Sequence, residues 1–382
     1  MFDSTFAWLL LPLGIALGWA WARSNRAPPG ETGSRADTLA GLSSLATDNA
    51  DQAIAALSRA AQADPAAAEL QLTLGGLFRK RGEIDRAIHL HETLLARPDL
   101  PPGVGDAARL ELAQDYLKAG LLDRAESLLE GLEGSGAQLV QALELLQDLH
   151  EQGRDWQQAI EVARRLQAAK GQSAAPRLAQ YWCELADAAR LQGDAAAAAR
   201  YLERALEEDP ECLRASLLEA GLAEGAKDWS TAIKAYWRAM QQDGRFFSEV
   251  APPLERCYKE SGNPKGYAEF LDEAERSLTD SAAPALARAR WLQAQGQDLR
   301  PYLGQHLARK PTREGLLLWL EGNTGEANPP PWLQTLKESL KKALQARPRY
   351  SCTSCGLQPT LLYWQCPRCR QWGKQVPVEE KL

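Results

Sequence analysis

Residues 74–88 read LGGLFRKRGEIDRAI, and this stretch predicts the fold of most of the chain. Helix-forming residues continue up to Gly82, which ends the helix, and Ala87 follows one turn into the next helical segment. The same order of helix end, turn and alanine returns at residues 120–126 and 227–233. Small residues at such positions let paired helices approach closely, so the pattern predicts a repeated helix–turn–helix unit.

The spacing of these alanines indicates the type of repeat. Successive alanines are 34, 38, 34, 39 and 34 residues apart, and 34 residues is the length of a tetratricopeptide repeat. The two longer spacings coincide with residues 101–103 and 171–173, which lengthen the turns between units. We therefore expect an all-α tetratricopeptide-repeat superhelix over residues 35–321, with a weaker pattern after residue 261. The alanines are Ala53, Ala87, Ala125, Ala159, Ala198 and Ala232.

Four cysteines near the C-terminus form two Cys-x-x-Cys pairs separated by ten residues. Four thiolates at this spacing can surround one metal ion as a tetrahedron and leave no position for a water ligand. We expect a structural zinc ion, with iron as the alternative because thiolates alone do not separate the two metals. A pair of redox-active dithiols is a further alternative, but it lacks the βαβ context of a thioredoxin-like motif. The predicted metal ligands are Cys352, Cys355, Cys366 and Cys369.

These cysteines define a small metal-binding ribbon at residues 348–382, which follows a spacer and helix at residues 322–347. A fold of this size cannot bury an adequate core, so the metal is expected to supply much of its folding free energy. Gly356 comes directly after the first cysteine pair and suits the positive φ that such a turn requires. The β-prone residues 360–364 are predicted to form one strand of the ribbon.

The N-terminus contains an uncharged run at residues 6–22, which reads FAWLLLPLGIALGWAWA. As a helix this run spans about 25 Å, near the lower limit for crossing a bilayer. We expect a transmembrane anchor at residues 1–23 and a linker at residues 24–34. Arg23 and Arg26 follow the run, so the positive-inside rule places the N-terminus outside and the body in the cytoplasm. A cleaved signal peptide is the alternative, although its positive charge normally precedes the apolar run.

Composition limits the classes of function. The net charge of −6 argues against a nucleic-acid partner, and no catalytic constellation is visible, so we do not expect an enzyme. The remaining cysteines are expected to be small buried side chains in helices. The histidines are scattered and are predicted to lie on the solvated surface. These residues are Cys183, Cys212 and Cys257, and His89, His91, His150 and His306.

The chain resembles the lipopolysaccharide assembly protein B family of Gram-negative bacteria along its whole length. The resemblance is carried by residues 74–88, 115–126 and 181–186, and most specifically by residues 348–356 and 362–369. It implies a single-pass protein of the inner membrane with a periplasmic N-terminus, a cytoplasmic body and a rubredoxin-type metal domain packed on the repeats. It also assigns metal binding to the four cysteines of the ribbon.

The resemblance further implies a non-enzymatic adaptor that works with the membrane-bound AAA+ protease FtsH. Its client would be the deacetylase that commits precursors to lipid A, and a lipopolysaccharide-sensing inner-membrane protein would restrain it. The hypothesis is therefore an adaptor that limits lipopolysaccharide synthesis through proteolysis. A rubredoxin-like electron carrier on a repeat scaffold and a general envelope assembly chaperone are the alternatives. The sequence leaves open whether the chain forms a homodimer.

Overall fold

The computed structural model describes residues 40, 50–63, 68–98, 100, 103–132, 136–322, 330–345 and 347–378. The predicted transmembrane anchor at residues 1–23 and the linker at residues 24–34 lie outside these residues. Within the described part of the chain, no helix has both the length and the apolar character needed to cross a bilayer.

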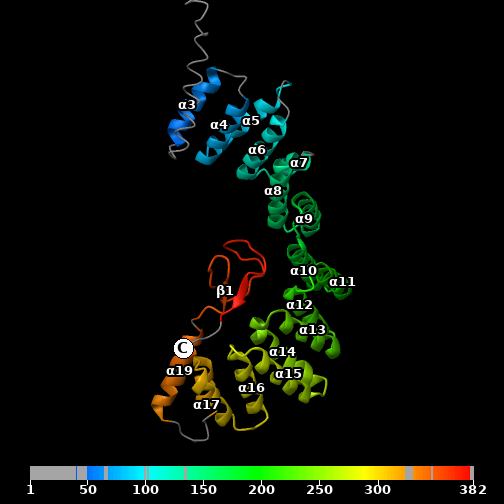
Figure 1. The fold of residues 1–382 in the computed structure, drawn as a ribbon, viewed down its shortest axis with the longest axis vertical. Helices are drawn as coiled ribbons and strands as arrows, with labels where there is room; N and C mark the ends of the chain where they lie inside the picture. The colour runs from blue at the N-terminus through cyan, green and yellow to red at the C-terminus, as the bar shows by residue number, and fades with distance from the viewer. Residues whose placement is uncertain are drawn as a thin grey trace, which may run out of the picture. The chain divides into compact units, whose positions relative to one another are not determined.

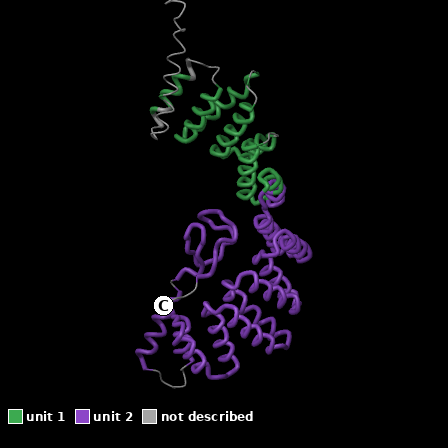
Figure 2. Tube along the Cα trace, in the orientation of Figure 1, with its two compact units in different colours: residues 1–155, 164–171 green, residues 156–163, 172–382 purple. Residues whose placement is uncertain are grey.

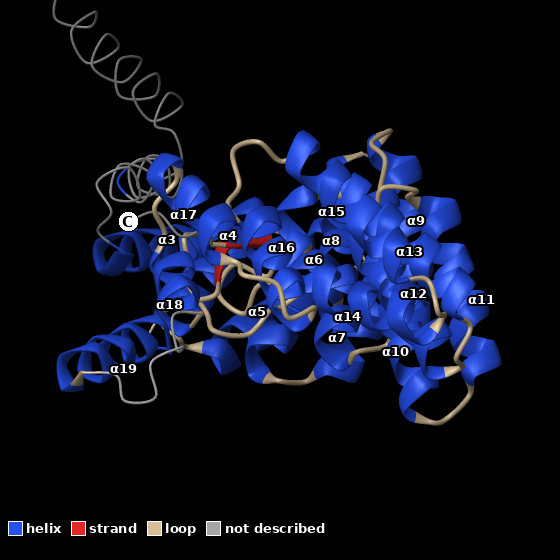
Figure 3. Cartoon of the chain, turned by 90° about the horizontal axis from the view of Figure 1, so that it is seen from below, coloured by secondary structure: helices blue, strands red, loops and turns tan. Residues whose placement is uncertain are grey.

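The described chain is helical up to residue 345 and ends in a small ribbon (Figure 1). The two strands of the ribbon are β1 (Tyr350–Cys352) and β2 (Gln375–Pro377), which pair antiparallel with Ser351 opposite Val376. Figure 3 shows that strand structure among the described residues is confined to this ribbon. The helices are α3 (Ala50–Ala63), α4 (Ala68–Arg81), α5 (Ile84–Leu95), α6 (Val104–Ala119), α7 (Leu122–Glu130), α8 (Ala137–Gly153), α9 (Trp156–Lys170), α10 (Ala175–Leu191), α11 (Ala195–Glu208), α12 (Leu213–Gly225), α13 (Trp229–Gln242), the 3-10 helix η1 (Gly244–Phe246), α14 (Phe247–Glu260), α15 (Pro264–Ser277), α16 (Ala283–Ala294), α17 (Arg300–Arg309), α18 (Arg313–Glu321) and α19 (Pro331–Gln345).

The repeat alanines lie where neighbouring helices touch. Ala87, Ala125, Ala159, Ala198 and Ala232 are all fully buried or nearly so, at 1% exposure or less. A larger side chain at these crossings would force the helices apart, which explains the regular return of alanine in the sequence. The prediction of an all-α repeat fold is confirmed.

The chain divides into two compact units, shown in different colours in Figure 2. The first unit contains residues 1–155 and 164–171, and the second contains residues 156–163 and 172–382. The second unit includes the start of α9, the helices from α10 onward and the ribbon. The weakly repetitive segment after residue 261 folds into the helices α15 to α18, so the helical pattern continues beyond the clear repeats.

A buried polar cluster lies between α4, α5 and α6 of the first unit. His91 and Asp115 are both fully buried, and His91 Nδ1 lies 2.6 Å from the Asp115 carboxylate. Arg79 donates to the same carboxylate at 2.7 Å and to Glu111. His91 fits here because Gly75 has no side chain: a Cβ at that position would lie 2.3 Å from His91 Nε2.

The prediction that the histidines lie on the solvated surface is therefore wrong for His91. It is also wrong for His150, which is buried 3.8 Å from Glu126. His89 is exposed as predicted, and His306 is half-buried. The physical reason is that the polarity of a side chain does not by itself determine its exposure, since a buried carboxylate can satisfy an imidazole.

Candidate metal centre

The two cysteine pairs lie on two turns of the ribbon that share the same backbone geometry. In the first turn, Gly356 N–H donates to the Cys352 carbonyl at 2.9 Å, and Cys352 N–H donates to Leu357 O at 2.8 Å. In the second turn, Arg370 N–H donates to the Cys366 carbonyl at 2.8 Å, and Cys366 N–H donates to Gln371 O at 3.0 Å. The donors and acceptors have the same sequence offsets in both turns, so the ribbon presents two equivalent pairs of sulfur atoms.

Each turn needs a left-handed residue after its second cysteine. Gly356 has φ of +72°, which confirms the expectation from the sequence. Arg370, the residue at the matching place in the second turn, has φ of +57° although it carries a side chain. The sequence analysis missed this position because arginine gives no signal for a positive φ, whereas glycine does.

The prediction of a strand at residues 360–364 is wrong. These residues form bends and irregular chain. The ribbon is closed instead by β1 pairing with β2 and by an isolated bridge between Gln365 and Trp372. The aromatic and β-branched composition of the segment does not lead to strand pairing, which is the usual weakness of β-propensity in a short segment.

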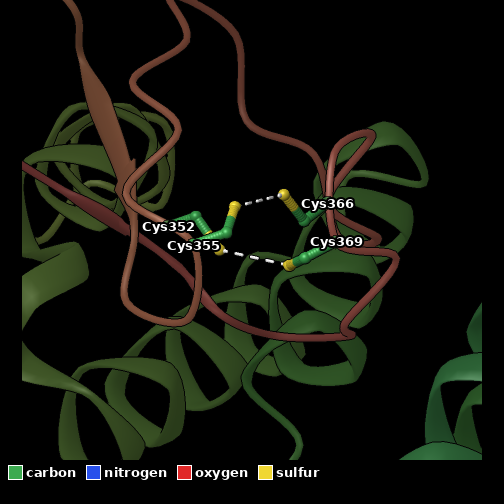
Figure 4. Close-up of side chains that lie close together, drawn as sticks. All are labelled: Cys352, Cys355, Cys366 and Cys369. Atoms are coloured by element: carbon green, nitrogen blue, oxygen red, sulfur yellow. Dashed lines mark hydrogen bonds between the residues drawn. The ribbon is translucent and has the colours of Figure 1, made fainter. Parts of the chain in front are cut away.

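The four sulfur atoms converge on one point, as Figure 4 shows. They all lie within 4.8 Å of one another. Cys352 Sγ is 3.7 Å from Cys369 Sγ, and Cys355 Sγ is 3.6 Å from Cys366 Sγ. A tetrahedral ion with metal–sulfur bonds of about 2.3 Å separates its sulfur ligands by about 3.8 Å. The described geometry therefore fits one four-coordinate metal ion, and zinc and iron both satisfy it.

Burial and pKa distinguish the ligands. Cys352 and Cys366 are buried, whereas Cys355 and Cys369 are half-buried. Burial raises the pKa of Cys366. This effect is outweighed by hydrogen bonds from the backbone N–H groups of Cys369 and Arg368 and by the neighbouring thiols, which together lower the pKa to about 6. For Cys355 a backbone N–H lowers the pKa, but burial and the other three thiols raise it to about 11. The four cysteines would hold a metal ion as thiolates, so metal binding would release protons from those that are protonated at neutral pH.

The ribbon is fixed to the repeats by aromatic contacts. The Trp372 ring meets Trp156 of α9 edge-on at 6.0 Å and Tyr181 of α10 edge-on at 5.9 Å. Trp156 and Tyr181 stack on each other at 5.8 Å. Trp156 and Tyr181 are buried among apolar residues of α9 and α10, so Trp372 completes a hydrophobic cluster of the second unit. Edge-to-face ring pairs of this kind add to the stabilisation from burial.

A second aromatic contact lies at the other side of the ribbon. The Trp364 ring stacks on Phe246 of η1 at 6.0 Å and 13°. The Arg214 guanidinium of α12 lies 5.8 Å from the centre of the same indole, within the range of a cation–π interaction. The ribbon is thus held by helices from successive repeats rather than by one helix.

Polar contacts hold the start of β1. The Tyr350 hydroxyl donates to Glu249 of α14 at 2.5 Å, and Arg349 lies 3.0 Å from the same carboxylate. Burial and the adjacent Glu249 carboxylate raise the pKa of Tyr350. The hydroxyl therefore stays protonated at neutral pH and remains a hydrogen-bond donor.

The fold and the site define a class: a tetratricopeptide-repeat protein with a docked rubredoxin-type metal ribbon. Comparison with protein families supports both parts. Residues 38–101 and 183–244 match the family described as "Tetratricopeptide repeat". Residues 350–374 match the family described as "Rubredoxin metal binding domain".

Full-length relatives identify the family more narrowly. The chain is 30% identical over 379 residues to lipopolysaccharide assembly protein B of Escherichia coli, with 97% of each chain covered. It is 29% identical over 389 residues to the protein of the same name from Haemophilus influenzae, with 98% of each chain covered. The chain therefore belongs to the lipopolysaccharide assembly protein B family.

Solved repeat proteins align less closely. The crystal structure of the APC/C hetero-tetramer Cut9-Hcn1 aligns with 57% of this chain and 41% of that chain, at 18% identity and a TM-score of 0.29. A score this low adds nothing to the identification.

Proposed function

We propose that this protein is a membrane-anchored, non-enzymatic adaptor of lipopolysaccharide biosynthesis. In this proposal it brings the deacetylase that commits precursors to lipid A to the membrane protease FtsH. Two observations support it: full-length membership of the lipopolysaccharide assembly protein B family, and a metal ribbon fixed onto helices α9 to α14 without an open coordination position. A closed four-thiolate site of this kind stabilises a fold and leaves no place for a substrate on the metal.

The proposed mechanism depends on tethering. The apolar run at residues 6–22 would hold the body in the plane of the protease and raise the effective concentration of a bound client. A lipopolysaccharide-sensing membrane protein would then regulate the adaptor from the same plane. The body itself would contribute binding surfaces, and the metal would keep the ribbon part of those surfaces in place.

A cavity beside the ribbon is the surface that we assign to the client. Its volume is about 560 Å³, and its walls come from α14, α16, the start of α18 and the chain on both sides of the ribbon. Arg245, Arg290, Arg349, Glu249 and Glu255 line it, so both signs of charge are present. Burial raises the pKa of Glu255, and the nearby positive charge of Lys259 opposes this shift. A polar segment of a protein with alternating charges suits this cavity.

The test is the lifetime of the deacetylase in cells that lack the endogenous adaptor. The wild-type chain should restore rapid degradation, and Cys366→Ser should fail to do so. A chain without residues 1–22 should restore it only weakly, although its body is folded. Leu191→Ala is the control, because Leu191 is 79% exposed and takes part in none of the ribbon contacts described above.

Two outcomes would contradict the proposal. If the chain without residues 1–22 drives deacetylase turnover at the normal rate, tethering is not the mechanism. If the deacetylase lifetime is unchanged by the presence of the wild-type chain, the adaptor role itself is wrong.

The metal decides between the adaptor and an electron carrier. We propose zinc, because a structural role needs no redox change. Elemental analysis of the purified full-length protein should give one zinc per chain and a colourless solution. A red protein with one iron and a reversible reduction would support the electron carrier instead.

A further inference from the structure

Two cysteines outside the metal ribbon lie together in the second unit. Cys183 belongs to α10, and Cys212 is the residue that precedes the first turn of α12. Their sulfur atoms are 4.0 Å apart although 29 residues separate them in sequence. Both side chains are buried, at 0% and 3% exposure. This pair of thiols has no part in the metal centre.

The surroundings of Cys212 favour a negative charge on its sulfur. Gln180 Nε2 donates to Cys212 Sγ at 3.7 Å. The Arg214 guanidinium lies in the same buried cluster, where it also approaches Gln180 Oε1 at 3.5 Å. The contact with Cys183 lowers the pKa of Cys212, and the Ala215 N–H and the positive charge of Arg214 act in the same direction. Burial and the Asp209 carboxylate oppose this shift, and the net direction is a lowered pKa. A thiol that precedes a helix and lies near an arginine is typical of reactive cysteines.

The surroundings of Cys183 have the opposite effect. Burial raises the pKa of Cys183 well above its usual range, and the neighbouring Cys212 sulfur raises it further. Cys183 therefore keeps its proton and donates it toward Cys212. The pair consists of one thiol disposed to ionise and a protonated partner within contact distance.

A cavity gives a small molecule a route to Cys212. Its volume is about 360 Å³, and its lining includes Cys212, Gln180 and Arg214 from the repeats and Trp364, Trp372 and Gln375 from the ribbon. Hydrogen peroxide is scarcely larger than water and fits such a space. The ribbon forms one wall of this cavity, so its docking limits access to the sulfur.

We propose that Cys212 and Cys183 form a peroxide-reactive pair, with Cys212 as the attacking thiolate and Cys183 as the resolving thiol. In the first step the Cys212 thiolate attacks one oxygen of hydrogen peroxide and the O–O bond breaks. Cys212 becomes a sulfenic acid, and the second oxygen leaves as hydroxide and takes up a proton to give water. The sulfur loses two electrons, and the peroxide gains them.

In the second step Cys183 attacks the sulfenic sulfur. The new S–S bond forms as the S–O bond breaks, and the Cys183 proton leaves with the hydroxyl group as water. A dithiol reductant returns the pair to two thiols by exchange. To form the disulfide, the two sulfur atoms must approach from 4.0 Å to about 2.0 Å. This approach draws the start of α12 toward α10. Arg214, which lies beside Trp364 of the ribbon, belongs to the same part of α12.

Cys257 provides an internal comparison. It is fully buried in the same unit, and burial together with Glu224 raises its pKa to about 11. No sulfur contact to Cys257 occurs among the described residues. Burial alone therefore does not separate Cys257 from Cys212. The two thiols differ in the direction of their pKa shifts and in the presence of a neighbouring thiol.

The experiment uses the full-length, metal-loaded protein in detergent, with metal content measured before and after each treatment. The protein is exposed to a small excess of hydrogen peroxide, alkylated and digested, and its peptides are analysed by mass spectrometry. We expect a disulfide between the peptides that carry Cys183 and Cys212, reversed by a dithiol reductant, with the metal retained. Cys257 should remain a free thiol.

Two variants make the result decisive. In Cys183→Ala the sulfenic acid on Cys212 cannot be resolved, so dimedone should label Cys212, whereas Cys257→Ala should form the disulfide as the wild type does. In the unoxidised protein at pH 7.5, iodoacetamide should label Cys212 at least about tenfold faster than Cys257. Equal labelling rates, or peroxide-treated protein with intact metal and two free thiols at these positions, would overturn the proposal.

Discussion

The repeats and the ribbon of the second unit are stabilised in different ways. The repeats bury alanines and large aromatic side chains such as Tyr267 and Phe270 in hydrophobic clusters between the helices. Among the described residues of the ribbon, Tyr350, Cys352, Cys366 and Gln375 are the buried ones, and two of these are metal ligands. The repeats thus hold their shape by packing, and the ribbon holds its shape by ligation and by contact with the repeats. Loss of the metal should therefore affect the two regions unequally.

Removal of one metal ligand should have the largest effect on this comparison. Cys366→Ser replaces a fully buried thiolate, so we expect loss of the metal and unfolding of the ribbon, while most helical structure persists. Limited proteolysis should cut the variant within residues 350–374, and circular dichroism should retain the helical signal. A variant that resists proteolysis there would show that the ribbon does not need its metal.

The repeats should respond most strongly to loss of a buried charge. Asp115→Ala leaves Arg79 and His91 without the carboxylate that both contact, and we expect a loss of about 3–5 kcal/mol in the free energy of unfolding. Chemical denaturation with a helical readout measures this change. Because Asp115 lies in the first unit, the metal content should stay at one ion per chain, and a loss of metal in this variant would contradict the separation of the two regions.

The aromatic contact between the regions should have an intermediate effect. Trp372→Ala removes the ring that touches Trp156 and Tyr181. We expect the free energy of unfolding to fall by about 2 kcal/mol. This loss is smaller than for a fully buried tryptophan because Trp372 is half-buried. We expect the metal to remain bound and the ribbon to become more accessible to protease. Trp332→Ala is the control, since Trp332 is 65% exposed on α19.

The polar contact at the start of β1 should have the smallest effect. Tyr350→Phe keeps the ring but removes the hydroxyl that donates to Glu249. We expect the free energy of unfolding to fall by about 1 kcal/mol. Thermal unfolding of the metal-loaded protein measures the change. A loss as large as that of Trp372→Ala would mean that the polar contact, rather than the aromatic one, holds the ribbon to the repeats.

The sequence predicted those features that depend on local spacing. The alanine period indicated the repeats because each alanine marks a helix crossing, and the two Cys-x-x-Cys pairs indicated a metal site whose four sulfurs do converge. Gly356 was predicted because glycine itself signals a positive φ. These features need no knowledge of which distant residues meet.

The features that the sequence did not predict depend on contacts between distant segments. His91 is buried because Asp115 and Gly75 meet it from other helices. Trp372 packs on Trp156 more than two hundred residues earlier in the chain. The sequence predicted Cys183 and Cys212 as separate buried thiols, but the chain folds so that their sulfur atoms lie 4.0 Å apart. The repeat period of the sequence does not predict these contacts between distant residues.

Hydrogen exchange on the full-length protein with and without its metal tests most directly whether the metal holds the ribbon on the repeats. After chelation we expect fast exchange at residues 350–374 and increased exchange near Trp156 and Tyr181, which lose their contact with Trp372. Exchange in α4 to α6 should not change, because these helices belong to the first unit. Unchanged exchange in the ribbon, or an equal increase throughout all helices, would contradict this account.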